Sequence, residues 1–110
     1  MRINQVRQLL EQWQTRLGLG VWRITVKWVA LENEHGNVEF DVLHRIATVG
    51  INKPKLLPQP ITVEYVLVHE LLHLVLIELE LVEKAKTDQK DMVLERVVNQ
   101  LTIALLERKQ

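Results

Sequence analysis

The longest apolar stretch of this 110-residue chain, residues 61–81, is the feature that most limits how the chain folds. It is long enough to cross a bilayer, but acidic and histidine side chains are spread along it, among them Glu64, His69, Glu70, His73 and Glu78. Charged groups in the middle of a membrane are costly, so a transmembrane segment is excluded. We therefore predict a buried helix that begins at Pro60 or Thr62 and ends near Leu81.

The composition is that of an ordinary globular domain, with 47% apolar and 25% charged residues, and the length fits one domain over residues 1–110. Fourteen basic residues balance fourteen acidic ones, so no overall field favours nucleic acid or a membrane as a partner. The absence of cysteine leaves histidines and carboxylates to hold any metal. The N-terminus lacks the apolar region of a secretory signal, and we expect a cytoplasmic protein.

The chain before residue 32 predicts a helix followed by a strand. Residues 4–17 place apolar side chains at the spacing of one helix face, and Gly18 and Gly20 end that helix. Residues 21–31 alternate between apolar and polar side chains, which is typical of a half-buried strand.

Two further strands are predicted before the apolar stretch. Residues 32–37 contain Gly36-Asn37 and indicate a turn, so that residues 38–42 form a hairpin with the preceding strand. Residues 45–51 are rich in strand-forming residues and predict the third strand.

The C-terminal part predicts a second long helix. A charged linker covers residues 82–87, and Asp88 caps the helix. Its apolar face is expected to contain Val93, Leu94, Val97, Val98, Leu101, Ala104 and Leu105. The predicted fold class is therefore α+β, with an N-terminal helix, a small three-stranded and mostly antiparallel sheet, and two further helices.

The segment His69-Glu70-Leu71-Leu72-His73 lies within the predicted buried helix. Residues four apart share one helix face, so both imidazoles can reach a single zinc ion, with Glu70 placed to hold a metal-bound water. The alternative is a pair of neutral core histidines bonded to backbone or carboxylates. Burying two rings and a carboxylate without partners costs several kcal/mol, which favours the metal.

A catalytic zinc ion usually has three protein ligands, so a third residue is needed. His35 lies in the predicted turn, where we expect it to be merely exposed, and His44 begins the third strand, where it is able to line a site. No histidine follows His73, which excludes both the extended metzincin motif and a three-histidine RNA-processing hydrolase.

A downstream carboxylate is therefore the expected ligand. Four glutamates lie too close to the motif or at the frayed end: Glu78, Glu80, Glu83 and Glu107. Glu95 is early in the last helix, and a helical hairpin brings it beside His69 and His73. Asn99, one turn later, is placed to accept a hydrogen bond from the far ring nitrogen of a ligating histidine. The alternative is that Glu95 pairs with Arg96 or Lys90 on a solvated face.

These residues resemble the zincin metallopeptidases, and within them the gluzincin branch, whose metal is bound by His-Glu-x-x-His and a glutamate on a later helix. The segment Glu95-Arg96-Val97-Val98-Asn99 is similar to that branch's Glu-x-x-x-Asp, with asparagine in place of aspartate. The short length and the order of elements resemble the minimal single-domain members, the minigluzincins.

The resemblance implies a zinc-dependent peptidase in which one zinc ion is held by His69, His73 and Glu95. Glu70 activates the metal-bound water, and a peptide or protein is the substrate. The alternative is a latent or inactive zinc-binding scaffold that captures peptides at an edge strand without turnover.

The resemblance also implies a substrate-binding edge, supplied in zincins by the strand before the active-site helix. In this chain that strand contains Ala47, Thr48, Val49 and Gly50, which would pair with the substrate backbone. The two local side chains considered as oxyanion donors are Tyr65 and His44.

Overall fold

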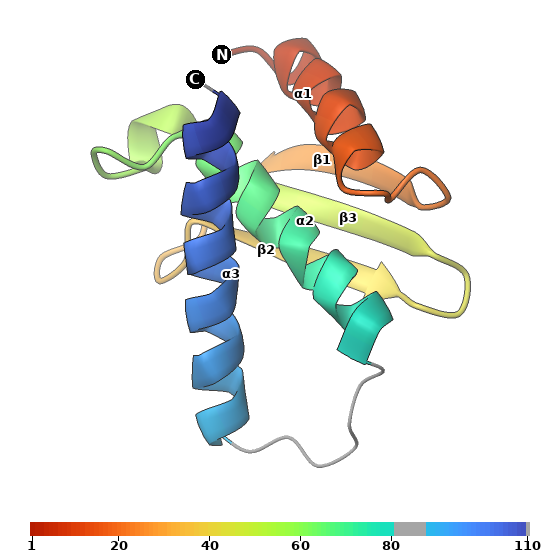
Figure 1. Ribbon diagram of the computed structural model, residues 1–110. Coiled ribbons are helices and arrows are strands. Elements are labelled where there is room, and N and C mark those ends of the chain that lie inside the picture. The colour runs from red at the N-terminus through yellow and green to blue at the C-terminus, as the bar shows by residue number, and fades with distance from the viewer. Residues whose placement is uncertain (81–87, 110) are drawn as a thin grey trace.

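The computed structural model describes residues 1–80 and 88–109, so the linker predicted at residues 82–87 lies outside the described residues. The fold is α+β, as predicted from the sequence (Figure 1). Its elements in chain order are α1 (Ile3–Arg16), β1 (Arg23–Val29), β2 (Gly36–Asp41), β3 (Ile46–Asn52), the 3-10 helix η1 (Pro54–Leu56), α2 (Val63–Glu80) and α3 (Asp88–Lys109).

The sheet is mixed and has β3 at its centre, in the strand order β1-β3-β2. β1 runs parallel to β3, with Arg23 opposite Ile46, and β2 runs antiparallel to β3, with Gly36 opposite Ile51. β3 has no charged side chain, whereas the outer strands alternate apolar residues with charged ones. The most apolar strand therefore takes the position that is covered on both edges.

The predicted hairpin between residues 21–31 and 38–42 is wrong, because β3 lies between β1 and β2. The hairpin is formed by β2 and β3 instead. Gly36 is the first residue of β2 rather than part of a turn, and it is buried. A Cβ atom there would lie 2.5 Å from Val66 Cγ1 and 2.7 Å from the Gly50 carbonyl oxygen. The glycine thus allows a close approach between β2 and α2.

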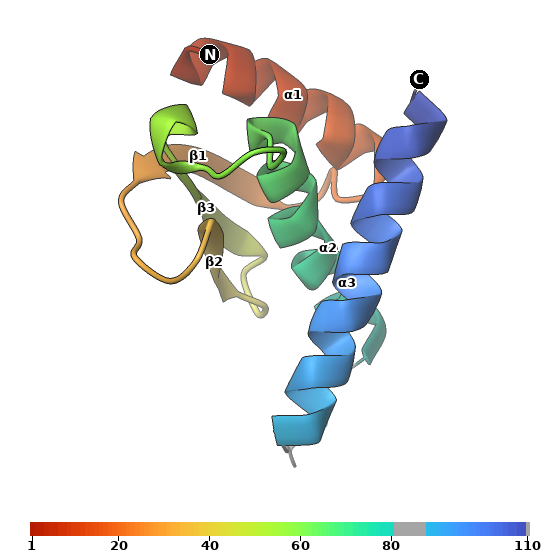
Figure 2. The same ribbon diagram turned by 90° about the vertical axis from the view of Figure 1, so that its left-hand side faces the viewer.

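The core lies between the sheet and the helices α1 and α2. It includes Val6 and Trp13 of α1, Val49 and Ile51 of β3, and Leu67, Leu71 and Leu74 of α2. The Trp13 indole nitrogen donates a 2.7 Å hydrogen bond to Glu64 Oε2, which ties α1 to α2. Figure 2 shows α2 between the sheet and α3.

α2 begins where the sequence predicts. The Thr62 hydroxyl accepts a 3.0 Å hydrogen bond from the Tyr65 amide, and the Thr62 carbonyl accepts one of 3.1 Å from Val66. Thr62 is therefore the residue that caps this helix. Among the described helices, none has the length and apolar character needed to cross a membrane.

α3 begins at Asp88, as predicted, but its buried face is narrower than expected. Val98 and Thr102 are fully buried and Leu105 is half-buried, whereas Leu101 and Ala104 are exposed. The reason is that α3 packs against α2, which covers one stripe of it. The remaining predicted positions lie outside the described side chains: Val93, Leu94 and Val97.

Candidate metal centre

His69 and His73 lie one helical turn apart on α2, as their spacing predicts. Their ring centroids are 5.1 Å apart. The two side chains are 15% and 17% exposed, so both rings are partly accessible, while Leu67, Leu71 and Leu74 of the same helix are buried in the core. The helix thus presents two imidazole nitrogens to the same space.

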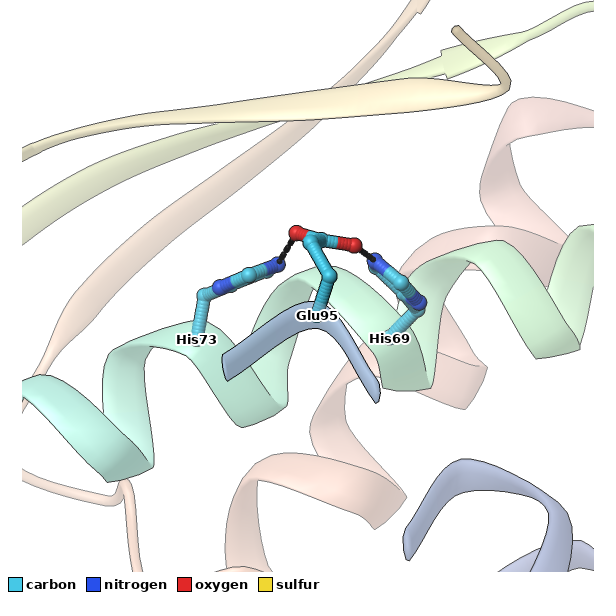
Figure 3. Close-up of side chains that lie close together, drawn as sticks. All are labelled: His69, His73 and Glu95. Carbon is cyan, nitrogen blue, oxygen red and sulfur yellow. Dashed lines mark ion pairs between the residues drawn. The ribbon is translucent and has the colours of Figure 1, made fainter. Parts of the chain in front are cut away.

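Glu95 reaches the two histidines from α3 (Figure 3). Its Oε2 lies 3.2 Å from His69 Nε2, and its Oε1 lies 2.8 Å from His73 Nε2. Val98 and Thr102, which follow at helical spacing, are buried, and this places Glu95 near the same side of the helix. The alternative partners Arg96 and Lys90 lie outside the described side chains.

The donor set fits a zinc ion. His69, His73 and Glu95 each offer one ligand atom, and these atoms lie within 4.8 Å of one another. Ligands at about 2.0–2.1 Å from a tetrahedral zinc ion are separated by about 3.3 Å. The 3.2 Å separation between His69 Nε2 and Glu95 Oε2 is close to that value, and the 2.8 Å separation between His73 Nε2 and Glu95 Oε1 is shorter. Two imidazoles and one carboxylate form a typical catalytic ligand set that leaves a fourth position open.

His69 is the more constrained of the two histidines. Burial lowers its pKa, and this effect exceeds the opposing influence of the Glu95 carboxylate. Its Nδ1 atom is buried and has no hydrogen-bond partner among the described residues. A neutral ring is the form that binds a metal, so this environment favours the ligating state.

Asn99 lies near His69, but it does not form the predicted hydrogen bond to Nδ1. Its side chain raises the pKa of His69, against the larger lowering by burial. Its Oδ1 accepts a 3.4 Å hydrogen bond from the Tyr65 hydroxyl. Tyr65 lies one turn before His69 on α2, so its hydroxyl occupies the amide oxygen that the sequence assigned to the histidine.

Glu70 is buried, with 7% of its surface exposed, and lines the same pocket as the histidines. Burial raises its pKa to about 8, with smaller contributions from the negative charges of Glu95 and Glu34. A cation held by the three ligands would act in the opposite direction and favour the ionised form.

The pocket over this cluster has a volume of about 350 Å³. One wall is α2 and Glu95, and the other is the segment that leads into β2. The described residues that line it are Asn33, Glu34, His35, Gly36, Val66, His69, Glu70, His73 and Glu95.

His35 is exposed, as expected, but it also lines the pocket, which the sequence did not indicate. Asn33 and Glu34 were missed in the same way. Gly36 is the sequence feature that could have indicated this segment. The sequence predicted a turn at this glycine, whereas in the structure it lets the chain pass close to α2.

The expected edge strand is wrong. Ala47, Thr48, Val49 and Gly50 lie in β3, whose backbone is paired on both sides, with β1 and with β2. A strand with both edges occupied cannot add a peptide strand. The outer strand next to α2 and the pocket is β2, which starts at Gly36.

Neither proposed oxyanion donor lines the pocket among the described residues. His44 is 64% exposed in the turn between β2 and β3, where Nδ1 lies 2.7 Å from Asp41 Oδ2. The Tyr65 ring lies 6.3 Å from the His69 ring, and its hydroxyl is directed to Asn99. His35 is the histidine outside α2 that the fold brings to the pocket.

Comparison with known proteins found no protein-family model and no curated protein that the sequence matches.

Proposed function

We propose that this protein is a zinc-dependent metallopeptidase that acts on peptides or proteins in the cytoplasm. The observation that carries the proposal is the convergence of His69, His73 and Glu95 beside a buried Glu70 in one pocket. The donor set supports zinc, since two imidazole nitrogens suit zinc better than magnesium or calcium. The ligand set is that of the gluzincins, which the sequence resembles.

Within this proposal each residue has one task. His69, His73 and Glu95 hold the metal, which supplies Lewis-acid chemistry that polarises a carbonyl and makes water a better nucleophile near pH 7. Glu70 accepts a proton from the attacking water and delivers it to the leaving amine. Its position in the pocket beside the two histidines supports this role, because a general base has to lie within reach of the water from which it takes the proton.

The substrate would bind in an extended conformation along β2. This strand pairs with β3 on one edge, and β1 lies on the far side of β3. Adding a peptide strand to β2 would place its backbone beside the pocket that Gly36 and Glu70 line. β2 thus replaces β3, the central strand, as the proposed site of substrate pairing.

The test combines metal content with turnover. We expect one zinc ion per chain, cleavage of an unstructured protein such as casein, and loss of cleavage on chelation. Glu70→Gln should keep the metal but lose hydrolysis. A Glu70→Gln protein that still cleaves at the wild-type rate would remove Glu70 from the mechanism. Zinc and peptide binding without any turnover by the wild-type protein would instead identify a zinc-binding scaffold.

A further inference from the structure

We propose that Glu34 makes the pocket selective for substrates with a basic side chain next to the scissile bond. This inference rests on the proposed peptidase function and names its substrate class. It concerns the wall of the pocket opposite α2, which the ligand set leaves unexplained.

The charges around the pocket leave one carboxylate uncompensated. The described lining residues include three carboxylates, Glu34, Glu70 and Glu95, and no lysine or arginine. The two positive charges of a zinc ion would balance Glu70 and Glu95. The charge of Glu34 then remains to attract a cationic group of the substrate.

Glu34 is available for such a contact. It is exposed, lines the pocket, and forms no ion pair with any residue that the structure describes. The segment from Asn33 to Gly36 leads directly into β2, along which we place the substrate. A substrate side chain near the scissile bond would therefore pass within reach of the carboxylate.

Asn52, which is 2% exposed, holds the backbone of the segment that carries Glu34 by hydrogen bonds. Its Nδ2 donates to the Glu34 carbonyl at 2.8 Å and to the Leu31 carbonyl at 3.2 Å, and its Oδ1 accepts from the Leu31 amide at 2.8 Å. The Asn52 amide also donates to the His35 carbonyl at 2.9 Å. A buried side chain thus holds the segment in place, so the position of Glu34 is built into the fold.

Gly36 holds the other end of the wall against α2. The space for a side chain is occupied by Val66 Cγ1 and the Gly50 carbonyl oxygen. The segment from residue 31 to residue 36 is therefore fixed both at Asn52 and at α2. A charge carried on such a support discriminates between substrates better than one on an unrestrained loop.

The experiment uses peptide sets that are identical except for lysine, glutamine or glutamate at each position flanking the scissile bond. We expect the zinc-loaded protein to cleave the best lysine peptide about twofold to fivefold better in kcat/KM than its glutamine counterpart, as for an exposed ion pair. The preference should shrink as ionic strength rises. Glu34→Gln should abolish it, and Glu34→Lys should reverse it toward the glutamate peptide.

Glu32→Gln is the matched control, because Glu32 is an exposed glutamate in the same connection that does not line the pocket. It removes the same charge and should keep the lysine preference. Equal cleavage of the three peptides by the wild-type protein, or an unchanged preference in Glu34→Lys, would overturn the inference while leaving the peptidase intact. Cleavage of none of them by zinc-loaded wild-type protein would instead refute the proposed function.

Discussion

Glu95 Oε1 lies 2.8 Å from His73 Nε2, although the two residues belong to different helices. The packing of α3 against α2 brings the glutamate to the histidine. The carboxylate lies 53% exposed over the rings, while the histidines are fixed on a helix that packs against the core. The candidate metal centre therefore depends on the packing of α3 as much as on the His-Glu-x-x-His motif.

The first prediction concerns the third ligand. Glu95→Ala should weaken zinc binding by roughly 100-fold or more, because losing a ligand costs more than the 10- to 100-fold typical of changes around the ligands. Competition with a chromophoric chelator measures the affinity. Glu107→Ala, which changes an exposed glutamate on the same helix, should leave it unaltered. Unchanged zinc affinity in Glu95→Ala would remove Glu95 from the ligand set.

The second prediction concerns pH and the metal-free protein. The pKa of Glu70 rises from 4.5 to about 8 on folding, so the folded state favours its protonated form, and stability falls as pH rises between these values. Folding lowers the pKa of His69 below 6.5, so the unfolded state binds the proton more readily. Stability is therefore lost as the pH falls below 6.5. Between pH 6.5 and pH 8 the pH dependence of stability therefore reports the titration of Glu70 and not that of His69.

Over that range the free energy of unfolding should fall by about 2 kcal/mol, which follows from about 1.4 kcal/mol for each pH unit. Urea denaturation of the chelator-treated protein at several pH values measures it. Glu70→Gln should give a nearly flat profile over the same range. A Glu70→Gln protein with the wild-type slope would assign the pH dependence to another group.

The third prediction concerns the buried amide below the pocket wall. Asn52→Ala should destabilise the protein by about 2–4 kcal/mol, because the partners at Leu31 and Glu34 lose their hydrogen bonds. Thermal unfolding measures the change, and amide exchange of residues 31–36 should rise. Asn33→Ala, an exposed change in the same segment, is the control and should cost less than about 0.5 kcal/mol. Equal stability of the two variants would contradict the assigned role of Asn52.

The fourth prediction uses two glycines. Gly36→Ala should destabilise the fold by about 1–3 kcal/mol, because its Cβ would lie 2.7 Å from the Gly50 carbonyl oxygen, which is backbone and cannot rotate away. Gly20→Ala places its Cβ where no atom lies within 4 Å and should be neutral or slightly stabilising. Chemical denaturation of both variants tests the comparison. A Gly36→Ala protein as stable as Gly20→Ala would show that the backbone at Gly36 is not packed so closely against Gly50 of β3.

The sequence predicts the local features of this molecule well. The start of α2, the start of α3 and the shared face of His69 and His73 follow from helix periodicity and capping, which act over a few residues. The approach of Glu95 is also predictable, since a carboxylate early in a following helix reaches back when the two helices pack as a hairpin.

Strand order is less accessible from the sequence, because it depends on pairings between distant residues. β3 displaces the expected neighbour of β1, and nothing local to residues 21–42 reveals this. The error on the substrate edge and the missed place of His35 at the pocket both follow from that one pairing, since strand order determines which connection passes over the pocket.

Because the candidate ligands come from two helices, binding of a metal ion at this site would be linked to the packing of α3 against α2. An ion bound by His69, His73 and Glu95 would cross-link α2 to α3 and stabilise their packing by its own binding free energy. Conversely, a partner or substitution that moves α3 away would release the metal without touching either histidine. The proposed activity would therefore depend on how α3 is held against α2.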